Sequence, residues 1–143
     1  WTHLLTGEVQ VGGSWRRATH DFLSLPLFVR PGAVIALGAV DDRPDYAFAD
    51  GVTFRVCELA DGQETTCSVP SLKGADTVTL TVRRTGKRYE ATLSGDSRAP
   101  WSLQLAGAGK IKVLGDALVV GDPLGPIAQS ASGSRKLECE LLA

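Results

Sequence analysis

Residues 22–38, FLSLPLFVRPGAVIALG, decide the fold class of this chain. Two short apolar runs, 25–29 and 33–37, flank the polar corner Arg30-Pro31-Gly32. Both runs are rich in β-branched or large side chains, which is typical of strands buried on both faces. The corner has the residues of a type II turn, because Pro31 presets φ at the second position and Gly32 accepts the positive φ of the third. The stretch therefore predicts two β-strands joined by a tight turn.

Beyond residue 50, apolar and polar residues alternate with a period of two, which is typical of half-buried strands. Asp61-Gly62 predicts a hairpin turn and Thr85-Gly86 predicts a second turn, whereas residues 121–134 are interpreted as a loop. No segment has a sustained helical period. We therefore predict an all-β fold, an antiparallel β-sandwich. Its strands are expected around residues 52–56, 78–83, 88–93, 101–105, 111–113, 118–120 and 137–141.

A polar, acidic stretch at residues 39–50, AVDDRPDYAFAD, separates the opening runs from the alternating strands. Pro44 lacks a backbone donor, so this stretch cannot continue a central strand. We predict a domain boundary here, with residues 1–40 ending an incomplete sandwich and residues 41–143 forming a second one. The sequence contains no Met and starts at Trp1. We therefore expect it to be cut or processed from a longer chain.

Charge and hydropathy exclude two classes of partner. The chain has 143 residues, with 15 Lys and Arg against 16 Asp and Glu and a formal net charge of −1. Neither a nucleic acid nor an anionic membrane surface is expected as a partner, because both are bound through clustered positive charge. No apolar stretch is long enough to span a bilayer.

The three cysteines, Cys57, Cys67 and Cys139, show no metal-binding spacing. Cys57 and Cys67 could face each other across a hairpin only if its loop had three residues, since a two-residue loop would put them on opposite faces. We favour buried or edge thiols in a reducing compartment. A cytoplasmic location is therefore expected.

The residues that could carry chemistry have simpler structural explanations. His3 and His20 lie near no nucleophile motif, so packing or surface roles are favoured over general-base roles. Asp41, Asp42 and Asp45 could ligate calcium. A capped turn with an ion pair between one of these aspartates and the intervening Arg43 is the favoured interpretation.

Aromatic side chains can stack on sugars when they are exposed. Trp101 and Tyr89 fall on the core-facing side of their alternating strands, so packing roles are expected for both. Trp15 and Tyr46 remain candidates for exposed rings, and Trp1 is a candidate for packing at an interface.

Residues 1–7 (WTHLLTG) and 24–38 (SLPLFVRPGAVIALG) resemble the end of a glycoside hydrolase family 31 enzyme. Arg43-Pro44-Asp45-Tyr46, Asp61-Gly62 and Arg84-Thr85-Gly86 resemble its bacterial α-xylosidase branch. The likeness is strong to about residue 69 and looser beyond it. The residues that match the motif of the first two stretches are Trp1, Thr6, Gly7, Pro26, Leu27, Phe28, Val29, Arg30 and Gly32.

The resemblance implies a place at the C-terminal end of a multidomain hydrolase. The family has an N-terminal β-sandwich, a catalytic (β/α)8 barrel, and proximal and distal C-terminal sandwiches; residues 1–40 would end the proximal one and 41–143 would form the distal one. Its catalytic nucleophile and acid/base are aspartates of the barrel, which takes about 250 residues. We therefore predict no catalytic, cofactor-binding or metal-binding residue in this sequence and no cofactor.

The function expected from this resemblance is that of a non-catalytic accessory region bracing the barrel of a retaining α-xylosidase/α-glucosidase-type enzyme. The chain itself would not be an enzyme, although its parent would hydrolyse xyloglucan-type or α-glucoside oligosaccharides. The expected partner is the upstream barrel, and a homo-oligomer is left open. The alternatives are a carbohydrate-binding module, favoured by exposed coplanar aromatics, and a stand-alone adhesion sandwich. A large apolar patch on residues 1–38 would favour the accessory role, and we expect incomplete cover there at Leu25, Leu27, Phe28, Val29, Val34, Ile35 and Leu37.

Overall fold

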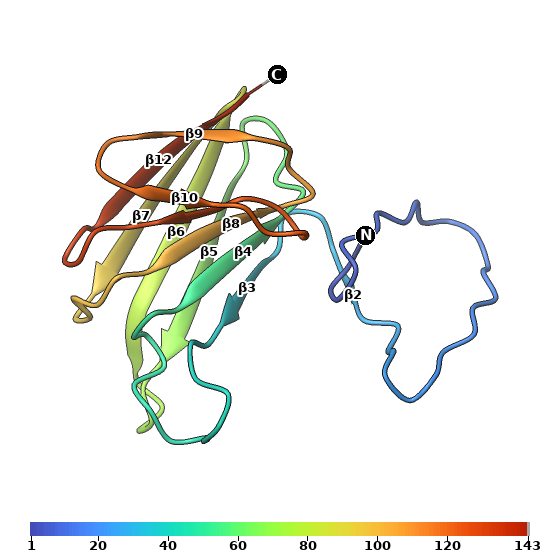
Figure 1. The fold of residues 1–143 in the computed structure, drawn as a ribbon, viewed down its shortest axis with the longest axis horizontal. Coiled ribbons are helices and arrows are strands. Elements are labelled where there is room, and N and C mark those ends of the chain that lie inside the picture. The colour runs from blue at the N-terminus through green and yellow to red at the C-terminus, as the bar shows by residue number, and fades with distance from the viewer. Residues whose placement is uncertain (143) are drawn as a thin grey trace.

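The chain folds into two five-stranded β-sheets stacked face to face, with a two-stranded sheet near its N-terminus (Figure 1). The structure, a computed structural model, describes residues 1–142 and their side chains except those at 76 and 77. No helix occurs in this described part, and none is present that could cross a membrane. The prediction of an all-β, antiparallel sandwich is confirmed, and one of its strand pairs is parallel.

The strand order of each sheet follows from the backbone pairing. The first sheet contains, from edge to edge, β10 (Leu118–Val120), β11 (Ile127–Gln129), β8 (Ser102–Ala106), β4 (Thr53–Cys57) and β3 (Val34–Leu37). The second contains β5 (Glu64–Pro70), β6 (Asp76–Thr85), β7 (Arg88–Gly95), β12 (Lys136–Leu141) and β9 (Ile111–Leu114). The small sheet pairs β1 (Thr2–His3) with β2 (Phe28–Val29).

The core lies between the two large sheets and is filled by the apolar positions of the alternating strands. Phe54 of β4 meets Trp101 edge to face, with 6.2 Å between ring centroids. Val78, Leu80 and Val82 of β6 are buried opposite them, as the period-two pattern predicts. The sequence therefore identified the inward face of these strands correctly.

β8 is buried on both faces, because it is the middle strand of the first sheet and its outer face is also covered. Leu103 and Leu105 point into the core, whereas Ser102 and Gln104 occupy the outer parity and are nevertheless buried. The loop after β10 covers Gln104, whose Nε2 donates to Asp122 Oδ1 at 2.9 Å and to the carbonyl oxygen of Gly125 at 3.1 Å. A polar side chain at this depth is retained because its amide is hydrogen-bonded.

The corner Arg30-Pro31-Gly32 forms the turn that its sequence predicts. Gly32 has φ +78°, and the amide of Ala33 donates to the carbonyl oxygen of Arg30 at 3.2 Å. The expectation that both flanking runs are strands buried on both faces was wrong. Before the corner only Phe28–Val29 is strand, with Phe28 exposed and Val29 buried, and β3 after it is half-buried.

The strand that follows this corner belongs to the large sandwich. β3 pairs antiparallel with β4, with Val34 opposite Val56 and Leu37 opposite Thr53. The backbone hydrogen bonds of residues 34–37 therefore go to a strand that lies beyond the predicted boundary at residue 40. Whether residues 1–40 and 41–143 correspond to two domains of a longer protein remains a prediction.

Two further expectations from turn residues need correction. Asp61-Gly62 makes a turn, with Gly62 at φ +75°, but it connects β4 of the first sheet to β5 of the second and is not a hairpin. The interpretation of residues 121–134 as loop missed β11, which lies between β10 and β8. Thr85-Gly86 does lie in a hairpin, because β6 pairs with β7 up to Thr85 opposite Arg88.

Candidate interaction surface

Exposed apolar side chains concentrate in the first 28 residues, a part of the chain that lies to one side of the sandwich (Figure 1). Of the sixteen large apolar side chains that are exposed in the described part, ten precede residue 30. Trp15 and Phe22 are fully exposed and Leu23 is 93% exposed. We call this set the N-terminal apolar segment: Trp1, Leu5, Val9, Val11, Trp15, Phe22, Leu23, Leu25, Leu27 and Phe28.

The expected incomplete cover of this region is confirmed in large part. Leu25, Leu27 and Phe28 are 58%, 42% and 41% exposed. Val29 departs from the expectation, since it is 7% exposed and pairs with buried Thr2 across the small sheet. Val34, Ile35 and Leu37 are half-buried because β3 lies at the edge of the first sheet. Apolar exposure on this scale is characteristic of a surface that packs on another protein.

A short hairpin anchors this segment next to the sandwich. The amide of His3 donates to Glu8 O and that of Gln10 to Trp1 O, each at 2.8 Å, so residues 1–10 form an N-terminal hairpin. Thr2 is bridged to Val9 on one side and Val29 on the other. Three short chain segments are thus held together around Thr2.

Polar contacts connect the N-terminal hairpin to the first sheet. The hydroxyl of Thr2 donates to Glu58 Oε1 at 2.6 Å, and Arg55 Nη1 donates to Leu4 O at 3.0 Å. Arg55 Nε also donates to Gln104 Oε1 at 2.8 Å. These contacts could not be predicted from the sequence, because Arg55 and Gln104 occupy the polar positions of alternating strands, which are typical of solvent-facing side chains.

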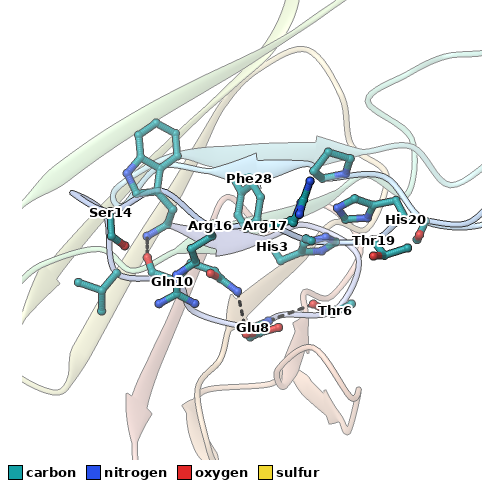
Figure 2. Close-up of a pocket in the computed structure, with 16 residues that line it drawn as sticks. His3, Thr6, Glu8, Gln10, Ser14, Arg16, Arg17, Thr19, His20 and Phe28 are labelled. Carbon is teal, nitrogen blue, oxygen red and sulfur yellow. Dashed lines mark hydrogen bonds between the residues drawn. The ribbon is translucent and has the colours of Figure 1, made fainter.

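A cavity of about 830 Å³ opens between this hairpin and the exposed stretch that follows it (Figure 2). His3, Glu8, Arg16, Arg17 and His20 are among its lining residues. Eight residues of the stretch 12–24 line it, and all residues of this stretch except Ser24 are exposed. The cavity is thus open and bounded by a segment that has little support from the rest of the chain.

The two histidines lie on this cavity but do not form a catalytic arrangement. His3 is largely buried against Phe28, with ring centroids 5.1 Å apart at 84°, and its Nδ1 accepts a hydrogen bond from the amide of Leu5 at 3.3 Å. His20 is exposed. His3 thus packs against a neighbouring ring and His20 lies on the surface, which are the two roles that the sequence favours for these histidines.

The acidic stretch before β4 does not assemble into a metal site. In the described residues no group of three or more His, Cys, Asp or Glu is placed to hold a metal ion. Asp41, Asp42 and Asp45 are all exposed, and none of them forms an ion pair with Arg43. The expected pairing of Arg43 with one of these aspartates was therefore wrong.

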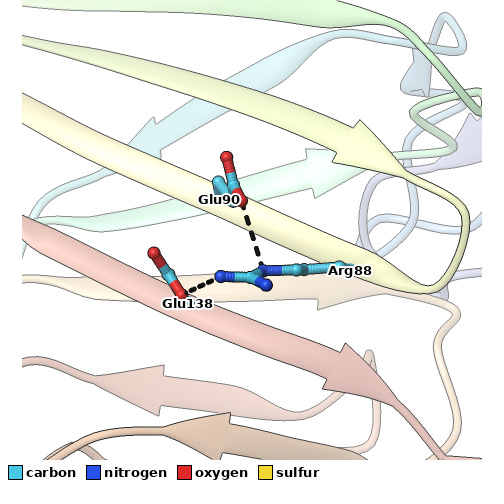
Figure 3. A network of polar contacts seen from close by, with 3 residues as sticks. All are labelled: Arg88, Glu90 and Glu138. Atoms are coloured by element: carbon cyan, nitrogen blue, oxygen red, sulfur yellow. Dashed lines mark hydrogen bonds and ion pairs between the residues drawn. The ribbon is translucent and has the colours of Figure 1, made fainter.

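An acidic pair does occur on the outer face of the second sheet, where Arg88 lies between Glu90 and Glu138 (Figure 3). Arg88 Nε is 3.2 Å from Glu90 Oε1, and its Nη2 contacts Glu138 Oε2. Side-chain exposures of 47%, 49% and 33% place this cluster in solvent, where such pairs contribute at most about 1 kcal/mol. A flat, open strand face with both carboxylates paired to one arginine lacks the enclosure of a catalytic acid pair.

The aromatic residues divide between the core and the surface largely as expected. Trp101 and Tyr89 are buried, and Trp101 Nε1 donates to Ser134 O at 2.9 Å. Trp15 is fully exposed, whereas Tyr46 is half-buried and packs edge to face on Phe48. Trp1 is half-exposed at the cavity.

The three cysteines are free thiols, as expected. Cys57 lies in the first sheet and Cys67 in the second, opposite Leu80, so they do not face each other across a hairpin. Cys139 is fully buried, and burial raises the pKa of its thiol to about 12. Burial also raises the pKa of Cys57 and Cys67, so none of the three has the lowered pKa of a reactive thiol.

The chain is an all-β sandwich domain, because its two large sheets enclose one hydrophobic core. A family model described as the C-terminal domain of alpha-xylosidase YicI matches residues 47–141. The chain belongs to this family, the C-terminal domains of α-xylosidases of glycoside hydrolase family 31. The match spans β4 to β12 and begins after β3.

Proposed function

We propose that this chain is a non-catalytic accessory region of a retaining α-xylosidase/α-glucosidase-type hydrolase, and that its N-terminal apolar segment packs on the preceding part of the enzyme. The observation that carries the proposal is the strong exposure of Phe22 and Leu23, within a segment that holds most of the exposed large apolar side chains of the described part. Each such side chain gains roughly 1.5–3 kcal/mol when it is fully buried. Membership of an α-xylosidase C-terminal family supplies the partner, an upstream catalytic domain.

The parent enzyme would act on xyloglucan-type or α-glucoside oligosaccharides in the cytoplasm. The free thiols at Cys57, Cys67 and Cys139 support a reducing compartment. Because the proposed catalytic aspartates belong to the barrel, the 143-residue chain should release no product from an aryl α-xyloside or an aryl α-glucoside. Turnover that is lost on replacing an aspartate of this chain would contradict the proposal.

The direct test uses the full-length hydrolase and measures its half-life of activity on an aryl α-xyloside at elevated temperature. Phe22→Ser combined with Leu23→Ser should shorten the half-life several-fold, because two buried apolar contacts with the rest of the enzyme are lost. The matched control is Leu72→Ser combined with Leu118→Ser, since these side chains are also exposed but lie outside the N-terminal apolar segment. Equal half-lives for both variants and the unmodified enzyme would contradict the proposal.

Calorimetry with xylose and xyloglucan oligosaccharides measures sugar affinity and thereby tests the alternative, a carbohydrate-binding module. Trp101 and Tyr89 are buried in the core, so they are not available for stacking on a sugar. We expect weak or no binding. Micromolar affinity that is abolished by Trp15→Ala or Tyr46→Ala would favour the binding module instead.

A further inference from the structure

Glu58 has an unusual backbone conformation for its residue type. Its φ is +45°, and it is the one non-glycine residue with a positive φ in the described part of the chain. An L side chain is disfavoured there by its own Cβ, so such a residue persists only where its surroundings or its side chain compensate. Glu58 directly follows the last residue of β4 and precedes the buried Leu59.

The side chain of Glu58 points to a reason for this conformation. Its Oε1 accepts the hydroxyl hydrogen of Thr2 at 2.6 Å, across 56 residues of sequence. Thr2 is 3% exposed and lies at the centre of the N-terminal hairpin, bridged to both of its neighbours. The hydrogen bond thus joins the best-buried polar residue of the hairpin to the end of β4.

Arg55 supplies a second contact from the same strand. Its Nη1 donates to Leu4 O at 3.0 Å, while its Nε donates to Gln104 Oε1 at 2.8 Å. Gln104 is in turn held by Asp122 and Gly125. The bond to Gln104 holds the guanidinium of Arg55 in place from the side of the sandwich. Less side-chain entropy is therefore lost when the guanidinium also binds the hairpin.

We propose that Glu58 and Arg55 are positioning residues of a polar joint that holds the N-terminal hairpin in one orientation on the sandwich, and that Glu58 keeps its disfavoured backbone conformation for this contact. The joint goes beyond the accessory role, since it fixes how the apolar segment is presented. It lies wholly within this chain, so its test does not depend on the identity of any partner.

The experiment measures amide hydrogen exchange in the full 143-residue chain. The reporters are the amides of His3 and Gln10, which are bonded within the hairpin. Thr2→Val and Glu58→Ala should each speed their exchange roughly tenfold, as expected for loss of a hydrogen bond to a charged acceptor. Amides of β6 and β7 should change less than twofold. Thr6→Val is the matched control, because Thr6 is exposed and its hydroxyl bonds only within the hairpin, to the amide of Glu8.

Two comparisons distinguish the loss of the Thr2–Glu58 hydrogen bond from the backbone requirement for positive φ at Glu58. The double variant Thr2→Val with Glu58→Ala should exchange no faster than either single variant, because both remove the same hydrogen bond. Glu58→Gly should loosen the hairpin as much as Glu58→Ala does, yet melt at a higher temperature than Glu58→Ala, because glycine adopts positive φ without strain. Hairpin exchange within twofold of the unmodified chain in Thr2→Val and Glu58→Ala, or additive effects in the double variant, would overturn the proposal.

Discussion

Gly125 lies in the loop that covers Gln104 and is in close contact with the backbone of β8. Its φ is +133°, and a Cβ added there would overlap the backbone carbonyl of Leu105. Gly62 has a positive φ of +75° but has no atom within 4 Å of the corresponding point. Both glycines therefore have a positive φ that disfavours other residues, but only Gly125 is also packed too closely to accept a Cβ.

Alanine substitutions at these two positions should separate the two costs. Gly62→Ala should lower the free energy of unfolding by about 1 kcal/mol, the cost of a left-handed alanine. Gly125→Ala should lower it by roughly 1–3 kcal/mol more, because the backbone of β8 must shift. Urea unfolding followed by tryptophan fluorescence gives both values. Equal losses in the two variants would show that the loop gives way without cost.

The buried thiols give a second prediction for single residues. Because burial raises the pKa of Cys139 to about 12, its thiol stays protonated and unreactive well above neutral pH. In the native chain at pH 8, Cys139 should react with a thiol reagent only as fast as the protein unfolds. In denaturant without reductant all three cysteines should react. Fewer than three reactive sulfurs would reveal a disulfide.

Among the elements, β3 shows which features could be predicted from the sequence and which could not. Its apolar run and the type II turn before it were both predictable, because the residue types themselves favour those conformations. Its partner was not, since the polar stretch at 39–50 looks like a boundary and pairing is set by long-range packing. β11 was missed for a related reason: at three residues, and close to two prolines, it has too little pattern to detect.

Removing β3 should therefore be more damaging than the sequence suggests. A chain shortened to start at Arg30 retains β3, whereas one that starts at Asp41 exposes the edge of β4 and the partly buried Val34 contact with the core is lost. We expect the shorter chain to be less stable by at least about 2 kcal/mol. Thermal melts followed by circular dichroism compare the two. Equal melting temperatures would instead support the boundary at residue 40.

The polar joint could not be predicted from the sequence for a similar reason. Arg55 and Gln104 alternate with core residues, and in a strand this alternation places them on the outer face of the sheet. They are covered because the N-terminal hairpin and the loop at Asp122 both lie over that face. Only the tertiary arrangement brings these distant segments together.

For the whole molecule, the sandwich buries its apolar side chains within the chain, whereas the N-terminal apolar segment does not. The sandwich has a closed core between its two sheets, whereas residues 12–28 leave most of their apolar side chains in water. Surfaces of this kind promote association when their partner is missing. The exposed segment was predictable from the family resemblance, because the strands it would pair with were expected upstream.

Light scattering on the purified 143-residue chain tests this most directly. If residues 1–28 form a packing surface, the chain should self-associate as its concentration rises, and Phe22→Ser with Leu23→Ser should restore the monomer, whereas Leu72→Ser with Leu118→Ser should not. A chain that stays monomeric at all concentrations, or one whose association is abolished only by the control pair, would contradict the assignment of these residues to an interface.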